Sequence, residues 1–125
     1  MAAGWQDRIV EQYRITDGKI VPLPRRAHAR RSHKRNEPLR ADYVLEREPH
    51  LPLAVVEAKR EHKLPGDGLQ QAKRYAEMLR VPLAYSTNGK GIVEHDYDTG
   101  IETRVDAFPT PQEAWKRYRA WKGLV

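Results

Sequence analysis

The chain has 125 residues, of which 23 are lysine or arginine and 17 are aspartate or glutamate, so its net charge is +6 at pH 7. A chain of this length fits one domain that folds without covalent staples, and the absence of cysteine excludes disulfides and thiolate metal sites. No apolar run is long enough to span a bilayer and no signal-like segment follows Met1, so we expect a soluble cytoplasmic protein without a membrane partner.

The first third of the chain predicts extended structure. Residues 7–16 (DRIVEQYRIT) are typical of a strand, 17–19 (DGK) of a turn, and 20–24 (IVPLP) of the start of a second extended piece. The next strand is predicted at 39–48 (LRADYVLERE), where apolar and polar residues alternate. A short turn-like link then leads into 53–60 (LAVVEAKR), which indicates a hairpin of two adjacent strands.

A basic loop at about residues 25–37 interrupts these strands. Its core, RRAHARRSHKR, holds six Arg or Lys, two His and no acid. Positive charge of this density attracts polyanions, and side chains such as Arg30 and Arg31 can neutralise the phosphates of DNA. A solvated surface loop explains the same composition, so both interpretations stay open.

The second half of the chain alternates helices and strands. Leu69, Ala72, Ala76 and Leu79 recur at helical spacing, so residues 69–80 are predicted to form an amphipathic helix that Pro82 ends. Residues 83–100 predict two short strands joined at Asn88 and Gly89, and TNGKG is interpreted as a hairpin turn rather than a phosphate loop. A last helix at 109–121 is expected to be capped by Thr110 and opened by Pro111. Together these elements predict an α/β fold with a mixed sheet flanked by helices.

The second predicted strand of the hairpin carries charge inside an apolar run. Alternation puts Leu53, Val55, Glu57 and Lys59 on one face and Ala54, Val56 and Ala58 on the other. If the hairpin forms, Asp42 comes opposite Glu57, and two close carboxylates repel unless a cation sits between them. Oxygen ligands of this kind favour magnesium, and a lysine beside the ion suits phosphodiester hydrolysis. The alternative is that these charges mark the solvent end of a strand and form weak surface ion pairs.

Other kinds of catalytic site find little support. The five histidines have no zinc-site spacing and are expected at the surface. Neither serine lies in a G-x-S-x-G context, which argues against a serine hydrolase. Phosphodiester hydrolysis at Asp42, Glu57 and Lys59 and the solvent end of a strand therefore remain the two interpretations of these residues.

The order and spacing of these residues resemble the PD-(D/E)xK nuclease superfamily. Within it, the sequence is most similar to the N-terminal nuclease domain of the type I restriction enzyme R (motor) subunit, through ADYVL, PLAVVEAKRE, GLQQAKRYAEML, VPLAYSTNGKGIVEHDYDTG and FPTPQEAWKRY. The resemblance runs from about Gly4 to Tyr118. The residues that carry its motifs are Asp42, Glu57, Ala58, Lys59, Gln71 and Tyr75.

The resemblance implies a restriction-endonuclease-like fold and a magnesium-dependent DNA endonuclease. It implies that Asp42, Glu57 and the Ala58 carbonyl bind Mg²⁺, with Mn²⁺ as a substitute, and that Lys59 acts on the attacking water or on the phosphate. It also implies that Gln71 and Tyr75, the family's Q-x-x-x-Y element, support the site. Helical geometry makes these two residues neighbours one turn apart, at the edge of the apolar stripe.

The resemblance further implies double-stranded DNA as substrate, and the helicase motor, methyltransferase and specificity subunits of a restriction complex as partners. Two departures are expected. The family's first core helix, which precedes Gly4 and Trp5, is expected to be absent, so that a second copy of the chain can cover the surface it leaves. No G-x-x-x-x-G-K-[ST] loop occurs, so no ATP site is expected in this chain. A non-catalytic nucleic-acid-binding module or a subunit-docking module with the same fold remains the alternative.

Overall fold

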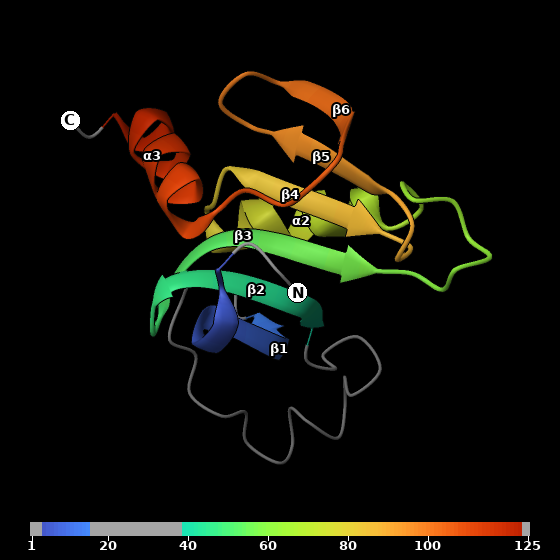
Figure 1. The fold of residues 1–125 in the computed structure, drawn as a ribbon. Helices are drawn as coiled ribbons and strands as arrows, with labels where there is room; N and C mark the ends of the chain where they lie inside the picture. The colour runs from blue at the N-terminus through green and yellow to red at the C-terminus, as the bar shows by residue number, and fades with distance from the viewer. Residues whose placement is uncertain (1–3, 16–38, 124–125) are drawn as a thin grey trace, which may run out of the picture.

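Six strands form one mixed sheet in which each strand pairs with the next along the chain (Figure 1). The computed structural model describes residues 4–15 and 39–123. The described strands are β1 (Ile9–Ile15), β2 (Leu39–Glu48), β3 (Leu51–Ala58), β4 (Leu83–Thr87), β5 (Ile92–Asp96) and β6 (Ile101–Val105). The described helices are the 3₁₀ helix η1 (Gln6–Arg8), α2 (Leu69–Leu79) and α3 (Pro111–Lys122). The predicted extended piece at 20–24 and the basic loop with Arg30 and Arg31 lie outside the described residues.

The strand directions explain the position of α2. Neighbouring strands pair antiparallel except β3 and β4, which are parallel. A parallel pair needs a crossover connection, and α2 forms part of it between these two strands. This helix lies against one face of the sheet, behind β3 and β4 in Figure 1, while α3 packs on the other face. The predicted mixed sheet flanked by helices is therefore confirmed.

β2 and β3 form the predicted hairpin, with two shifts of register, one on each strand, and the shift on β3 changes which face a core residue occupies. The pairing shifts by one residue between Ala54 and Pro52, which leaves Leu53 as an extra residue on β3. A bulge of this kind interrupts the alternation of side chains between the two faces. Leu53 consequently packs in the same apolar cluster as Ala54 and not on the face of Val55, so the predicted alternation was wrong at this position.

α2 forms at the predicted residues because its apolar side chains share one stripe. Its buried residues are Leu69, Ala72, Tyr75 and Ala76. They pack with Val44, Val55 and Ala84 from the central strands, which form the core on this side of the sheet. The helix ends at Leu79 and is capped by Arg80, whose left-handed backbone (φ 59°) closes the last turn.

α3 begins at the predicted cap on the other face of the sheet. Thr110 Oγ1 accepts a hydrogen bond from Glu113 N at 3.2 Å, and Glu113 Oε1 accepts one from Thr110 N at 2.8 Å. This capping box, with Pro111 in the first turn, fixes the start of the helix. Trp5 is fully buried beneath this region, and its Nε1 donates to Pro109 O at 2.8 Å, which ties the first described residues to the segment before α3.

Two buried acids of β5 hold α3 against the sheet. Arg117 donates to both carboxylate oxygens of Glu94, at 2.9 and 3.0 Å, and to Asp96 at 2.8 Å. Tyr85 Oη donates to the same glutamate at 2.6 Å. Because a buried carboxylate is costly unless it is paired and hydrogen-bonded, Arg117 is the residue that allows both acids to lie under the helix.

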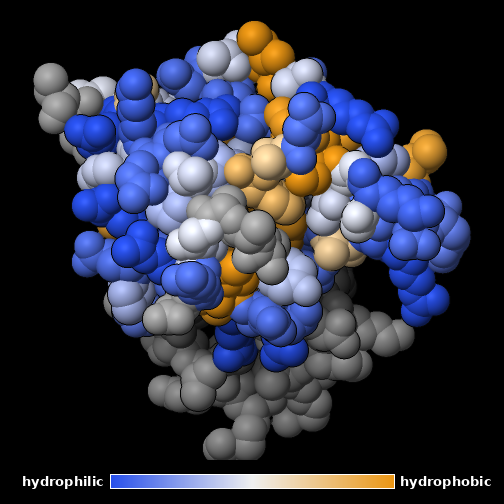
Figure 2. Space-filling model, viewed as in Figure 1, coloured by the Kyte–Doolittle hydropathy of each residue, from blue (hydrophilic) through white to orange (hydrophobic). Residues whose placement is uncertain are grey.

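The face of the molecule seen in Figure 2 is mostly hydrophilic, and apolar side chains show there in small groups. Among the described residues, the large apolar side chains that are exposed are Leu64, at 70%, and Ile101, at 58%. None of the described helices is long and apolar enough to cross a membrane. The apolar surface expected for pairing with a second copy stays a prediction.

Candidate active site

β2 and β3 separate at the end that carries Asp42 and Glu57. Their backbone ladder runs as far as the pair of Tyr43 and Val56. One step further, Asp42 N donates to Glu57 Oε2 at 2.9 Å, and Ala58 N donates to Asp42 Oδ2 at 2.9 Å. Side-chain oxygens thus continue the hydrogen bonding where the backbone ladder stops. The two acids that the sequence predicted to lie opposite each other are brought together.

Burial sets the acidity of Glu57. Glu57 is only 4% exposed to solvent, and this burial raises the pKa of its carboxyl group to about 7. The hydrogen bond from the Asp42 backbone and the charge of Lys59 lower the pKa, while the Asp42 carboxylate raises it. A carboxyl group that titrates near neutral pH beside a second acid is typical of a functional site.

Lys59 follows β3 directly, and its N–H donates to Thr87 O of β4 at 2.7 Å. The residue is exposed, but its stem lies over the start of α2. A Cβ at Gly68 would be 3.2 Å from Lys59 Cε, 3.1 Å from Glu57 Cβ and 3.0 Å from Ser86 Oγ. The buried Ser86 Oγ also accepts a hydrogen bond from Gly68 N at 2.9 Å. The missing side chain at Gly68 therefore lets the helix approach the residues expected to do chemistry.

Gly68→Ala should destabilise the fold by about 1–2 kcal/mol, because the new methyl group has no room beside two buried strand residues. The backbone of Gly68 (φ −94°) suits any residue, so the cost comes from crowding alone. Gly66→Ala is the matched control, since its Cβ would make an ordinary contact of 3.5 Å with Val93. Urea unfolding of both variants checks this prediction, and equal midpoints would show that the helix start can move aside.

Gln71 and Tyr75 lie one turn apart on α2, as their spacing predicts. Gln71 Nε2 donates to Tyr75 Oη at 2.7 Å. Tyr75 is buried in the core between α2 and the sheet, at 4% exposure, and so lies deeper than the edge position expected for it, whereas Gln71 is exposed. Within the described residues, neither side chain hydrogen-bonds Glu57 or Lys59. Their support of an active site stays a prediction.

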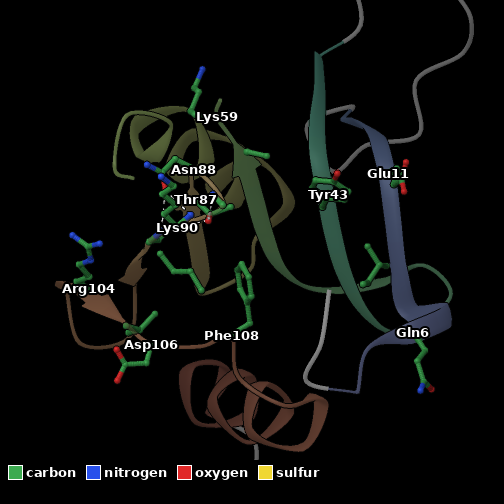
Figure 3. A pocket seen from close by; sticks show the side chains of 16 residues that line it. Gln6, Glu11, Tyr43, Lys59, Thr87, Asn88, Lys90, Arg104, Asp106 and Phe108 are labelled. Carbon is green, nitrogen blue, oxygen red and sulfur yellow. Dashed lines mark hydrogen bonds between the residues drawn. The ribbon is translucent and has the colours of Figure 1, made fainter. Parts of the chain in front are cut away.

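A cleft of about 970 Å³ opens beside Lys59 (Figure 3). It lies on the α3 side of the sheet, where Phe108 also packs. Figure 3 shows Lys59, Lys90 and Arg104 on one side of the cleft and Glu11 on the other, with Phe108 between them. The cleft is wide and open to solvent, and it leads along the sheet toward the end of β3.

The donor atoms near Asp42 and Glu57 are suited to a hard cation. One oxygen of each carboxylate accepts a backbone hydrogen bond, and no further hydrogen bond from a described residue reaches the other oxygen. Clusters of three or more His, Cys, Asp or Glu are absent from the described residues. Mg²⁺ commonly binds through one or two carboxylates and keeps several waters, so two acids and the neighbouring Ala58 carbonyl fit it.

Several residues that shape this region were not singled out from the sequence. Gly68 stands at the start of α2 where Ser or Asp is more common, and Ser86 is a polar residue inside an apolar strand. A glycine at a helix start and a serine inside an apolar strand are the two signals in the sequence that could have pointed to these residues. The expectation of surface histidines was wrong for His95, which is 8% exposed and whose Nδ1 lies 2.9 Å from Glu102 Oε2.

The topology and the solved structures of known proteins define the class of fold. No family model matches the chain. A fragment structure described as an HsdR subunit of a type I restriction enzyme from Vibrio vulnificus YJ016 superposes with a TM-score of 0.78 at 42% identity, covering 98% of this chain and 23% of that one. The fold is an α/β fold of the restriction-endonuclease-like class, as predicted.

A curated relative extends this similarity to a named subunit. The chain is 37% identical over 131 residues to the type I restriction enzyme EcoAI endonuclease subunit of Escherichia coli, covering 98% of this chain and 15% of that protein. The chain is therefore homologous to a segment of the type I restriction enzyme endonuclease (HsdR) subunit, which confirms the resemblance found in the sequence. It spans less than a quarter of the length of either relative.

Proposed function

We propose that the chain is a magnesium-dependent DNA endonuclease domain of the PD-(D/E)xK type, which hydrolyses phosphodiester bonds within a type I restriction system. The main support is the pair of Asp42 and Glu57, held by reciprocal hydrogen bonds of 2.9 Å where two strands separate. Lys59 follows two residues after Glu57, at the mouth of an open cleft. The relatives named as restriction endonuclease subunits support the same activity.

The proposed roles follow from the chemistry of each group. Asp42, Glu57 and the Ala58 carbonyl would hold Mg²⁺, or Mn²⁺ in its place. When bound, the ion would lower the pKa of a coordinated water and offset charge on the phosphate. The Lys59 ammonium would bind a phosphate oxygen or orient the attacking water, since a cation aimed at developing negative charge is the usual electrostatic contribution of a protein to such a step.

The proposed substrate is double-stranded DNA in the cytoplasm. Arg30 and Arg31 of the basic loop would add phosphate contacts, and the Gln71–Tyr75 pair would support the site from α2. Within a restriction complex, the motor, methyltransferase and specificity subunits would be the partners, and ATP would be bound elsewhere than in this chain.

A second candidate is a DNA-binding or subunit-docking module that keeps the fold without cleaving. The observation in its favour is the small number of acids, because the described residues place two carboxylates together and not three. Divalent-metal binding separates the two functions. A nuclease needs it, and a binding or docking module does not.

The parent chain should nick supercoiled plasmid in Mg²⁺ or Mn²⁺ and lose this activity in excess EDTA. Calorimetric titration with Mn²⁺ should give binding that Asp42→Asn abolishes, since removal of one of two charged ligands leaves too little charge to hold the ion. Asp98→Asn is the control, because Asp98 is an exposed acid in the turn between β5 and β6. Failure of the parent to bind either metal would favour the module without catalysis.

A further inference from the structure

The turn between β4 and β5, residues 88–91, is tightly braced. Asn88 Oδ1 accepts hydrogen bonds from Lys90 N and Gly91 N, both at 2.9 Å, and Asn88 Nδ2 donates to Lys63 O at 2.7 Å. Thr87 Oγ1 donates to Gly91 O at 2.7 Å. These bonds fix the turn against the loop that leads into α2. The hairpin turn predicted from the sequence therefore has a fixed backbone, from which the side chain of Lys90 projects.

Arg104 of β6 lies directly over this turn. A Cβ added at Gly91 would be 2.5 Å from Arg104 Nη2 and 2.8 Å from Pro65 Cγ. A side chain at position 91 would therefore force the guanidinium or the Pro65 ring to move. Arg104 forms no ion pair with a described residue, and Lys90 meets Glu61 at 3.7 Å with both side chains more than two-thirds exposed. An exposed pair of this kind holds its partner weakly, so both cations can contact a ligand.

Lys90 and Arg104 stand on the same side of the cleft as Lys59 (Figure 3). The acids that line the cleft do not interrupt this row of cations. Glu11 lies on the opposite side, and Asp106 lies beyond Arg104, at the end of the row away from Lys59 (Figure 3). A row of positive groups on a rigid edge, leading to a lysine at the end of β3, matches a ligand with regularly spaced negative charges.

We propose that Lys90 and Arg104 form a phosphate-binding edge that grips the backbone of duplex DNA and guides it to Lys59. This inference rests on the proposed nuclease function and adds the surface that holds the substrate. The hydrogen bonds of the turn fix the backbone from which Lys90 projects, so less backbone ordering is needed when DNA binds. Phosphate contacts carry no base information, so this edge binds all sequences alike.

The test measures DNA affinity and not cleavage. Anisotropy titration of a fluorescent duplex in EDTA, repeated at several salt concentrations, should show that Lys90→Ala/Arg104→Ala flattens the slope of log affinity against log salt by about 2, since each lost phosphate contact removes about 0.9. Arg74→Ala/Lys116→Ala removes the same charge away from the cleft and should change the slope by less than half as much. The charge-preserving Lys90→Arg/Arg104→Lys variant should keep the parent slope.

Each outcome decides the proposal. Equal slopes for the two alanine pairs, or no duplex binding by the parent, would overturn the phosphate edge. If the parent nicks plasmid while the slopes are equal, the nuclease function stands and only this surface is wrong. If only the Lys90→Ala/Arg104→Ala variant flattens the salt slope and the parent never nicks DNA, the phosphate-binding edge is supported and the catalytic proposal fails. Melting temperatures of all variants near the parent value exclude unfolding as the cause.

Discussion

Replacing Lys59 with alanine should reduce magnesium-dependent plasmid nicking at least about a hundredfold, the scale measured for one electrostatic group aimed at a transition state. Folding should be nearly unaffected, because Lys59 is exposed and substitutions at such positions usually change stability by less than about 0.5 kcal/mol. Binding of DNA in EDTA should stay close to the parent, since several other cations line the cleft. First-order rates of supercoiled-plasmid loss at saturating Mg²⁺ measure the effect, and Mn²⁺ provides a second condition.

The control for this loss is Lys63→Ala, which removes an equal charge from the loop after Lys59. Lys63 contributes its backbone carbonyl, not its ammonium, to the turn beyond β4, so the variant should nick at a rate within about threefold of the parent, the effect of one exposed and screened charge. If Lys59→Ala cuts as fast as Lys63→Ala, Lys59 is the solvent end of a strand and has no part in catalysis.

Local signals were sufficient for the elements that surround the site. α2 follows from apolar residues at helical spacing, and α3 from Thr110, Pro111 and Glu113, whose capping box forms as this pattern indicates. The hairpin of β2 and β3 follows from two alternating runs and a short link. From that pairing the meeting of Asp42 and Glu57 could be predicted, because the register of a hairpin fixes which residues face each other.

Features that depend on distant partners could not be predicted. The extra residue at Leu53 belongs to the pairing of β3 with β2, and no local pattern in the sequence marks it. β6 was missed because its residues are largely exposed and only Ile101 and Val105, at its two ends, are apolar. The buried acids Glu94 and Asp96 look like surface residues until Arg117, more than twenty positions later, is placed over them.

In the candidate site, too, some residues could be predicted from local sequence and others could not. The acids and Lys59 stand out in sequence because charge interrupts an apolar strand. The contacts around them do not stand out in the sequence. One example is the hydrogen bond of 2.9 Å from Gly68 N, at the start of α2, to Ser86 Oγ on the neighbouring strand β4. Such contacts arise from the crossover between β3 and β4, which brings together residues that are far apart in the chain.

Glu57→Gln should weaken Mn²⁺ binding by more than about a hundredfold, because the loss of a charged ligand costs more than the roughly 10–100-fold typical of groups that only support a ligand. The parent should show a pH dependence that the variant lacks. Because burial raises the pKa of Glu57 to about 7, above the ordinary value of 4.5, the metal-free folded state holds this proton more tightly than the unfolded state does. The resulting stability is fully present below about pH 4.5 and is lost as the pH rises to about 7.

Metal binding should follow the opposite trend, since the carboxylate must be deprotonated to act as a ligand. Affinity for Mn²⁺ should rise with pH up to about 7, by as much as about tenfold per unit below that point. In EDTA at pH 8, Glu57→Gln should melt roughly 3 °C above the parent, because the neutral amide keeps a hydrogen-bond acceptor for Asp42 N without a buried charge. Melting curves and Mn²⁺ titrations between pH 5 and 8 measure both trends.

Glu61→Gln is the matched control for these experiments, because Glu61 is an exposed acid four residues further along the chain, 3.7 Å from Lys90. It should keep the parent's metal affinity and its loss of stability between pH 4.5 and 7. If Glu57→Gln binds Mn²⁺ like the parent, Glu57 is not a metal ligand. If its stability still falls over the same pH range, another group carries the raised pKa, and the buried acid beside Asp42 would have to be structural.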